Sequence, residues 1–400
     1  MGKNILFKIS GSIAAYKSCE LISKLVQKGF EVQVVATKAA LQFVGVATLE
    51  GLTGKKVLSE TFSEGDMMSH IQLNRWADLT ILCPATGNTI NEMAAGISTN
   101  LVTTLFLAHD FKKRYLVAPA MNEKMYQHPA TRASLKKLND WGVKVLPVDS
   151  GYLGCGDVGD GRLLNVAQIY REILKALVKP VGRVLITSGG TIEPIDQVRA
   201  ITNFSSGRTA AQIAESFFFA GFDVTYLHAA GAPLPDVPCK ALSFKTFGDL
   251  QNLMREELHL TDVDVFVHAA AVSDFFVKSA VSGKIESNGP LTLALEKNPK
   301  LLNLVKNLSK QKSLALVGFK LTVGAPQESK KLAIDKLFNE SGCDFVVSND
   351  LSDISDSSHR GEIVSSNGNR VKFSDKKQLG ENLVRLVQIR KIEKFQEVSL

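Results

Sequence analysis

Short apolar runs recur along the first half of the chain, each with the length of a buried strand. They fall at residues 5–9, 31–37, 79–83, 115–118 and 143–147. Stretches with helical spacing lie between them, including residues 14–28, which Gly29 ends, and residues 129–139, which begin with a proline. Strands that alternate with helices in this way predict a parallel sheet with helices on both faces.

The same pattern restarts behind an amphipathic helical segment at residues 166–177. Residues 209–220 and 377–391 have helical spacing, and Asn367-Gly368 between two short runs predicts a hairpin. Apolar runs of strand length lie at residues 183–187, 223–228, 263–269, 314–319, 344–347, 361–365 and 370–373. The pattern predicts an α/β protein of two doubly wound Rossmann-like domains, 1–179 and 180–400.

Composition and charge narrow the classes of partner. The chain has 400 residues, of which 45% are hydrophobic and 22% charged, as in ordinary globular domains. Its formal charge of +7 comes from scattered lysines and arginines without a nucleic-acid-binding module, which favours anionic small substrates over nucleic acid or a membrane. No run of signal-peptide or membrane-spanning length is present, so we expect a cytoplasmic protein.

The cysteines do not form a pattern. All five cysteines are far apart in the sequence, which indicates neither a disulfide framework nor a zinc site. We expect free thiols, one of which is a candidate for chemistry.

The first candidate site follows the strand at residues 5–9. Gly11, Ser12 and Ile13 open a helix, where free backbone N–H groups bind phosphate. The turn is not Gly-x-Gly-x-x-Gly, and Thr37 ends the second strand where a dinucleotide site would have an acidic residue. This favours an FMN-like mononucleotide over NAD, although a turn that only closes a strand remains the alternative.

Further segments of the first half narrow the family that it resembles. Residues 83–89 carry Thr86, Asn88 and Thr89 directly after a strand, residues 118–122 end on Asn122, and a glycine-rich loop at 154–162 holds Cys155. Together with Ser69-His70-Ile71 and residues 75–78, they resemble the phosphopantothenoylcysteine decarboxylase branch of the homo-oligomeric FMN-containing cysteine decarboxylases. The likeness extends over about residues 3–162.

The resemblance implies a decarboxylase with bound FMN, in which Gly11, Ser12, Ile13, Thr37, Thr86, Asn88 and Thr89 bind the cofactor. It assigns His70 to the catalytic base, Asn122 to the substrate carboxylate and Cys155 to proton donation. An α-carboxylate leaves as CO₂ only with an electron sink, which oxidation of the cysteine side chain to a thioaldehyde provides. Taken alone, His70 would be a structural histidine and Cys155 an inert thiol.

Two departures affect the expected flavin contacts. Ser98-Thr99-Asn100 replaces the family's usual Ala-Asp-Asn, and Gly87 stands where alanine is common.

In the second half, about 20 residues separate the strand at 183–187 from the helix at 209–220. A connection of that length is normally functional. It contains Ser188-Gly189-Gly190-Thr191 and ends on residues 203–208, which offer Asn203, hydroxyls and a cation to an anion. With residues 269–275, 283–285, 297–299 and 317–319, it resembles the phosphopantothenate–cysteine ligase domain over residues 183–350.

This second resemblance implies that CTP and Mg²⁺ convert 4'-phosphopantothenate into an acyl-cytidylate, which the amine of L-cysteine attacks. Asp274 would take part in the Mg²⁺ site, Lys284 would neutralise phosphate charge, and Asn203 would position the intermediate. The residues implied in nucleotide binding are Ala270, Asp274, Lys284, Lys300, Leu301, Leu302, Asn303, Phe319 and Lys336. Outside the motif, Asp274 and Lys284 would be ordinary surface charges.

Glu286 and Glu340 stand where relatives often carry lysine. Because two positive charges are missing, we expect a raised KM for CTP without loss of the reaction.

The two motif sets in this order resemble the bifunctional family of coenzyme A biosynthesis. That resemblance implies trimers of the flavin domain and dimers of the ligase domain, consistent with a dodecamer. Two alternative functions belong to other classes of protein. A phosphatase-regulating subunit would carry a long acidic extension, and a flavin prenyltransferase or dinucleotide-dependent reductase would not need the second domain.

Overall fold

A computed structural model describes most of the chain. The side chains of residues 69, 70 and 394–398 are outside the description. The described residues are 3–60, 69–152, 156, 158–278, 283–286, 291–354 and 358–398. The chain forms two compact units, Met1–Leu177 and Val178–Leu400.

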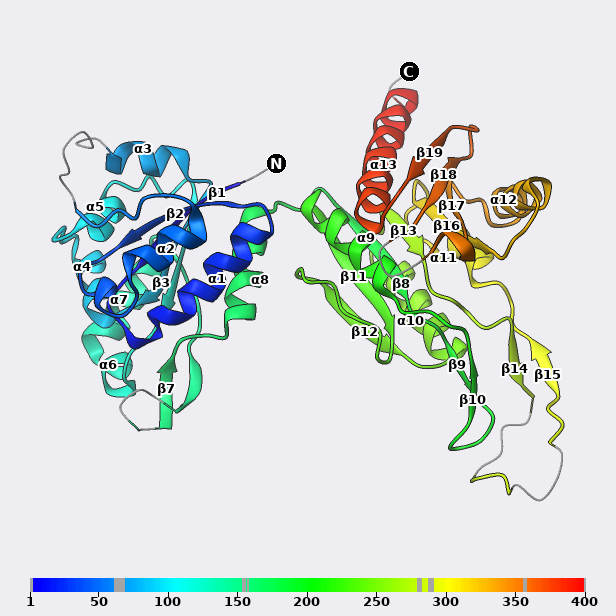
Figure 1. Ribbon diagram of the computed structural model, residues 1–400, viewed down its shortest axis with the longest axis horizontal. Helices are drawn as coiled ribbons and strands as arrows, with labels where there is room; N and C mark the ends of the chain where they lie inside the picture. The colour runs from blue at the N-terminus through cyan, green and yellow to red at the C-terminus, as the bar shows by residue number, and fades with distance from the viewer. Residues whose placement is uncertain are drawn as a thin grey trace. The chain divides into compact units, whose positions relative to one another are not determined.

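The first unit is built on a five-stranded parallel sheet with the order β2-β1-β3-β4-β5. Strands β1, β2 and β3 are labelled in Figure 1. The strands are β1 (Asn4–Ile9), β2 (Glu31–Ala36), β3 (Leu79–Ala85), β4 (Arg114–Pro119) and β5 (Lys144–Val145). All four neighbouring pairs run parallel. The strand order reverses between β1 and β3, where open sheets of this type bind their ligands.

Helices cover both faces of this sheet. They are α1 (Tyr16–Gln27), α2 (Val46–Thr53), α3 (Ser69–Trp76), α4 (Gly87–Ala95), α5 (Leu101–Leu107), α6 (Glu123–Gln127), α7 (Pro129–Asp140) and α8 (Val166–Leu177), with the 3₁₀ turns η1 (Ile13–Ala15) and η2 (Ala40–Gln42). On one face α1 packs against α8. On the other, α4, α5 and α7 enclose an apolar core with Leu6, Leu82 and Val117 of the sheet.

One sequence expectation about this unit is wrong. Residues 158–162, expected within a glycine-rich loop, form strand β7 (Val158–Arg162), which pairs antiparallel with β6 (Asp149–Tyr152). The reason is a close approach that only glycine permits. Gly161 lies under the turn after β4, where an added Cβ would be 2.3 Å from the carbonyl oxygen of Met121.

The second unit has an eight-stranded sheet with the order β12-β11-β8-β13-β16-β17-β18-β19. Its strands are β8 (Gly182–Ser188), β11 (Phe222–Ala229), β12 (Lys240–Phe244), β13 (Val265–His268), β16 (Ala315–Thr322), β17 (Phe345–Asp350), β18 (Gly361–Ser365) and β19 (Arg370–Phe373). The first six strands in chain order run parallel, and the predicted hairpin β18–β19 adds two antiparallel strands. The order reverses between β8 and β13.

Helices again cover both faces. They are α9 (Arg208–Phe219), α10 (Phe247–Leu260), α11 (Val305–Leu308), α12 (Gln327–Ser341) and α13 (Lys376–Val398), with the 3₁₀ turns η3 (Leu301–Leu304) and η4 (Leu351–Asp353). α9 packs against α13, whereas α10, α11 and α12 contribute to one apolar core. The predicted α/β class with two doubly wound sheets is confirmed.

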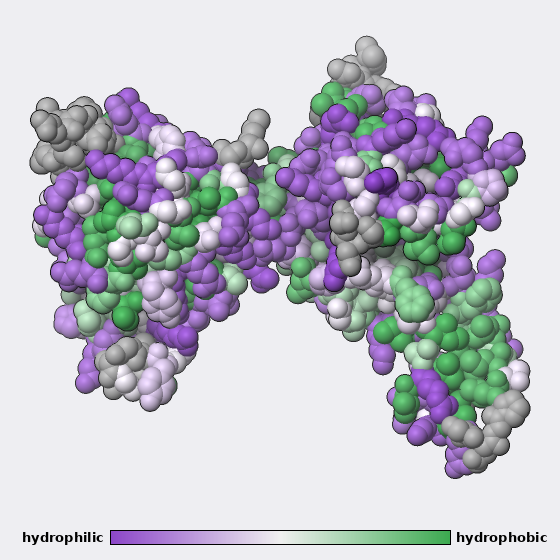
Figure 2. All heavy atoms as spheres, viewed as in Figure 1, coloured by the Kyte–Doolittle hydropathy of each residue, from purple (hydrophilic) through white to green (hydrophobic). Residues whose placement is uncertain are grey.

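Two antiparallel strand pairs extend beyond this sheet and lie side by side (Figure 1). They are β9 (Ile192–Pro194) with β10 (Ala200–Thr202), and β14 (Phe275–Val277) with β15 (Leu295–Lys297). Hydrophobic residues gather on the β14–β15 extension in Figure 2, where Phe275, Leu291 and Leu295 are about half exposed.

Candidate functional site

The turn after β1 brings the chain against the end of β2. Ser12 caps η1, because its Oγ accepts a hydrogen bond of 3.3 Å from the N–H of Ala14. A Cβ added to Gly11 would lie 2.5 Å from the Cβ of Ala39. The turn can therefore approach residue 39 only without a side chain at position 11.

The end of β3 is tied to the same turn. Ser10 Oγ donates to the carbonyl of Pro84 (2.8 Å) and accepts from the N–H of Thr86 (2.9 Å). Thr86 then begins α4 as its N-cap and shares a hydrogen bond of 3.2 Å with the hydroxyl of Thr89. The first turn of α4 thus presents hydroxyls at the carboxyl edge of the sheet, beside Gly11 and Ser12.

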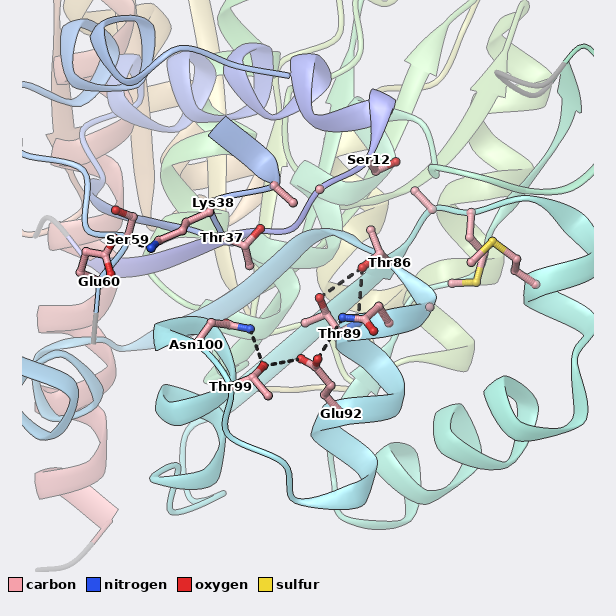
Figure 3. A pocket seen from close by; sticks show the side chains of 17 residues that line it. Ser12, Thr37, Lys38, Ser59, Glu60, Thr86, Thr89, Glu92, Thr99 and Asn100 are labelled. Carbon is pink, nitrogen blue, oxygen red and sulfur yellow. Dashed lines mark hydrogen bonds and ion pairs between the residues drawn. The ribbon is translucent and has the colours of Figure 1, made fainter. Parts of the chain in front are cut away.

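These segments enclose a cavity of about 670 Å³ (Figure 3). Hydroxyl, amide and backbone groups from several segments of the chain line it, and two methionines supply apolar surface. The lining residues are Gly11, Ser12, Thr37, Lys38, Ala39, Ser59, Glu60, Thr86, Gly87, Asn88, Thr89, Glu92, Thr99, Asn100, Ala120, Met121 and Met125. Six of the seven residues predicted to bind the cofactor are among them; Ile13 is not.

A second hollow of about 450 Å³ shares Ser12, Ala120 and Met121 with this cavity. Ile13 and Asn122 line it. Asn122 is the N-cap of α6, and its Oδ1 accepts from the N–H of Lys124 (2.9 Å). The predicted carboxylate-binding residue therefore lies in the hollow adjoining the cavity.

Sequence reasoning missed several residues of the two hollows. Lys38, Ser59, Glu60 and Glu92 line the larger one, and Tyr152 the smaller one. Of these residues, only Glu92 could have been predicted from the sequence. It lies four residues after Asn88 on one helix and therefore on the same helix face.

The thiols of the first unit differ in exposure. Burial raises the pKa of Cys83 to about 12, so this thiol stays protonated at neutral pH. Among the described residues, Cys19, Cys83, Cys239 and Cys343 are not part of a disulfide. Cys155 and the side chain of His70 lie outside the described residues.

In the second unit, the strand order reverses between β8 and β13, and a buried hydroxyl forms hydrogen bonds at this point. Thr187 Oγ1 accepts from the N–H of Ala270 (3.2 Å) and lies 2.9 Å from His268 Nδ1. Burial lowers the pKa of His268 to about 4, so the imidazole is neutral at pH 7 and shares this hydrogen bond with the Thr187 hydroxyl. The backbone that begins the predicted nucleotide-binding segment is fixed by this pair.

The long connection after β8 folds back on the same segment. Asn203 Nδ2 donates to the carbonyl of Val272 (3.1 Å), and Gly190 pairs with Ala271 as an isolated bridge. A Cβ at Gly190 would lie 2.6 Å from the carbonyl oxygen of Asn203. The predicted positioning residue Asn203 thus lies directly beside residues 271–272.

A buried carboxylate joins the long connection to the segment that carries Lys284. Asp196, whose side chain has no exposed surface, accepts from the N–H groups of Val198 (2.8 Å), Arg199 (2.7 Å) and Ile285 (3.1 Å). Arg199 Nη2 donates to the carbonyl of Ile285 (3.1 Å). The N–H of Val198 is the leading group that lowers the pKa of Asp196. The side chain of Lys284 is exposed, but its backbone position is restricted because the adjacent residue Ile285 is held by these hydrogen bonds.

Asp274, the predicted metal ligand, forms an ion pair with Lys300, and both side chains are exposed. Within the described ranges no three His, Cys, Asp or Glu side chains are grouped as a metal site would require. A single carboxylate suits a cation that keeps most of its waters or takes further ligands from a phosphate substrate.

The remaining predicted nucleotide-binding residues differ in exposure. Leu301 and Leu302 are buried in the apolar core of the second unit, so only their backbone is available to a ligand. Asn303 Oδ1 accepts from the Ser341 hydroxyl (2.5 Å), and Phe319 is half-buried in β16. Lys336 is exposed, with its Nζ 3.7 Å from Glu340.

No helix in the described parts of the chain combines the length and apolar character needed to cross a membrane.

Comparison with known proteins identifies both halves. The model of the Flavoprotein family matches residues 1–178, and that of the DNA/pantothenate metabolism flavoprotein C-terminal domain matches residues 181–390. A coenzyme A biosynthesis bifunctional protein CoaBC of Thermococcus kodakarensis is 35% identical over 358 residues, 88% of this chain and 86% of the relative. Its namesake in Bacillus subtilis is 34% identical, over 87% of this chain and 86% of the relative.

Among solved structures, a DNA/pantothenate metabolism flavoprotein from Streptococcus pneumoniae is similar to part of the chain. It is 29% identical and covers 52% of this chain and 99% of its own, with a TM-score of 0.46. The match of the Flavoprotein family supports the predicted flavin cofactor.

Proposed function

Because this chain belongs to the family of coenzyme A biosynthesis bifunctional proteins, we propose that its two domains catalyse consecutive steps. The chain is a bifunctional enzyme, a phosphopantothenate–cysteine ligase and a phosphopantothenoylcysteine decarboxylase. The observation that carries the division is the order of the two family matches in one chain. We assign decarboxylation to residues 1–179 and ligation to residues 180–400.

The flavin cavity fits FMN in size and chemistry. A volume of about 670 Å³ is in the range of cofactor pockets, and its hydroxyls and amides match the ribityl chain and phosphate. Gly11, Ser12, Ile13, Thr37, Thr86, Asn88 and Thr89 would hold FMN. When bound, FMN supplies the electron sink and later returns the electrons.

The chain's own groups then handle the substrate. Asn122 holds the carboxylate of 4'-phosphopantothenoylcysteine in the adjoining hollow, so that the carboxylate is oriented for loss as CO₂. His70 accepts the substrate proton. Cys155 donates a proton to the enethiolate that remains after CO₂ has left, and the two electrons that bound FMN would return are also needed to give 4'-phosphopantetheine.

In the ligase domain we propose that the carboxylate of 4'-phosphopantothenate attacks the α-phosphate of CTP. Pyrophosphate leaves, and the acyl-cytidylate is attacked by the amine of L-cysteine, with CMP as the second leaving group. Lys284 neutralises phosphate charge and Asn203 positions the acyl-cytidylate. Ala270, Lys300, Leu301, Leu302, Asn303, Phe319 and Lys336 contribute to the nucleotide site.

We also propose Mg²⁺ as the metal of the ligase site, with Asp274 as its protein ligand. Asp274 forms an ion pair with Lys300 in this structure. Mg²⁺ bound to the triphosphate would compete with Lys300 for the carboxylate, and the released ammonium would then be free to contact phosphate. Asp274 and Lys300 would in this way exchange partners when CTP arrives.

The test of this function is a spectrum followed by an assay. Purified protein should show flavin absorbance, and 4'-phosphopantothenate, CTP and cysteine together should release pyrophosphate and CO₂. Colourless protein that releases neither product would contradict the proposal. Omission of cysteine should abolish CO₂ release, because the decarboxylase substrate would not form.

Assembly and location are part of the same proposal. We propose trimers of the flavin domain and dimers of the ligase domain, in a cytoplasmic enzyme. The half-exposed apolar side chains of the β14–β15 extension support a protein contact at the ligase domain. Native mass measurement of the full chain would give a multiple of both two and three protomers; a monomer would contradict this assembly.

A further inference from the structure

Glu92 is an acidic residue in the wall of the flavin cavity whose role the proposed mechanism does not include. It lies on α4, four residues after Asn88 and therefore on the same helix face. Both of its carboxylate oxygens are engaged. Oε1 accepts from Asn88 Nδ2 (3.0 Å) and Oε2 accepts from Thr99 Oγ1 (3.1 Å), as Figure 3 shows for Thr99.

In the hydrogen bonds around Glu92, each neighbouring group donates toward the carboxylate. Asn100 Nδ2 donates to Thr99 Oγ1 (3.1 Å), and Thr99 donates onward to the carboxylate. Asn100 is itself fixed, since its Oδ1 accepts the N–H of Thr103 (3.2 Å) as the N-cap of α5. An ionised carboxylate only accepts, so it forms the end of this chain and requires a donor from each neighbour.

This requirement determines how the Asn88 amide is turned. Its Nδ2 must face Glu92, because the alternative orientation would place two acceptors against each other. Asn88 also lines the cavity, and within the described ranges no protein group donates to its Oδ1. The amide carbonyl is therefore left as an acceptor for a ligand in the cavity.

We propose that Glu92 is a positioning residue of the flavin site. It fixes Asn88 so that the amide carbonyl accepts a hydrogen bond from a donor of the cofactor, either the ring N3–H or a ribityl hydroxyl. This inference rests on the proposed function in that FMN is the ligand. It also implies that a flavin without the matching hydrogen-bond donor binds this site more weakly than FMN.

The experiment compares FMN dissociation constants, measured by quenching of flavin fluorescence in the full chain after removal of bound flavin. Glu92→Ala releases the Asn88 amide, and we expect about tenfold weaker FMN binding, the effect of one lost hydrogen bond. Glu92→Gln can still accept from Asn88 and donate to Thr99, and we expect binding within about threefold of the original chain. A role of the negative charge alone would instead make both variants equally weak.

Asp140→Ala is the matched control. Asp140 accepts from Lys136 at the same four-residue spacing on α7, where both side chains are exposed and neither lines a hollow. Its removal should leave FMN binding unchanged. Far-UV circular dichroism checks that each variant is folded, and alanine is a good helix former at both positions.

Modified flavins identify the donor. If N3–H is the donor, the preference of the original chain for FMN over 3-methyl-FMN disappears in Glu92→Ala. If a ribityl hydroxyl is the donor, the same loss is seen with the corresponding deoxyribityl analogue. The inference is overturned if folded Glu92→Ala binds FMN as tightly as the original chain or keeps every analogue preference. Failure of the original chain to bind FMN would instead contradict the proposed function.

Discussion

Lys8 is fully buried in β1, on the same face of the sheet as Leu6. Its Nζ donates to the Tyr115 hydroxyl (3.2 Å) and lies 3.4 Å from the carbonyl of Val102, with no carboxylate among these partners. Burial holds the pKa of Lys8 well below its ordinary value. Burial therefore favours the neutral form of this hydrogen-bonding group.

Lys8→Met should change how stability depends on pH. In the unfolded chain this lysine is protonated below about pH 10.4, whereas the folded chain loses the proton at a lower pH, so the free energy of unfolding rises with pH between the two pKa values. Just below the unfolded pKa, the variant should lack up to about 1.4 kcal/mol of this rise per pH unit. Fluorescence in a denaturant titration reports it, since both tryptophans, Trp76 and Trp141, lie in the first domain. Equal slopes for the two chains would show that Lys8 is charged when folded.

Glu286 and Glu340 set the charge near the proposed triphosphate. Glu340 lies 3.7 Å from Lys336 on an exposed helix face, so it partly neutralises a proposed phosphate contact. We expect Glu286→Lys with Glu340→Lys to lower the KM for CTP several-fold at low ionic strength, with a smaller effect in high salt. Steady-state pyrophosphate release at two salt concentrations measures this. A KM that does not change would remove the charge explanation.

At the scale of elements, the turn from β1 into α1 decides whether the flavin cavity has its shape. Gly11→Ala would force a Cβ to within 2.5 Å of the Ala39 Cβ and 3.0 Å of its carbonyl carbon. Since these atoms belong to packed backbone and a short side chain, the turn must move. We expect FMN to bind at least tenfold more weakly, measured by equilibrium dialysis. Gly51→Ala on α2, where nothing lies within 4 Å, is the control and should bind normally.

The connection between β8 and α9 is the second element with a specific task. Asp196→Ala removes the acceptor that ties Ile285, and with it Lys284, to this connection. We expect ligase kcat to fall about tenfold to a hundredfold with unchanged decarboxylase activity, because misplacement of a charge-neutralising group slows chemistry. Separate assays of pyrophosphate release and of CO₂ release from 4'-phosphopantothenoylcysteine distinguish the two.

Asp249→Asn is a suitable comparison for Asp196→Ala, since Asp249 also accepts backbone N–H groups, at the start of α10. It should retain ligase activity. Equal losses in the two variants would indicate general destabilisation of the domain.

At the scale of the whole molecule, the chain consists of two units, and the boundary between them lies at residues 177–178. Cys155→Ser should stop the final protonation and reduction but allow ligation, oxidation and loss of CO₂. We expect the enethiol to accumulate, detectable by its ultraviolet absorbance and mass, while pyrophosphate release continues. Full formation of 4'-phosphopantetheine by the variant would exclude Cys155 as the proton donor.

The periodicity of the sequence predicted most strands and helices of both domains because each buries a continuous apolar run. The hairpin at β18–β19 and helix α8 have the predicted bounds. β7 was missed, since its residues Val158–Arg162 have almost no apolar signal and are held by backbone pairing and by the fit of Gly161 beneath Met121. Likewise, β9 and β10 exist only through pairing within the long connection.

The sequence by itself determined the α/β class, the two-domain order and the residue types at each strand end, because these follow from local periodicity and short motifs. Only the tertiary structure decided which of those residues share a cavity. It placed Ile13 in the adjoining hollow and Leu301 in the core, and it linked Asp196 to Ile285 and Glu92 to Thr99. Such contacts join positions that are distant in the chain, and the orientation of a side chain depends on partners that local sequence does not specify.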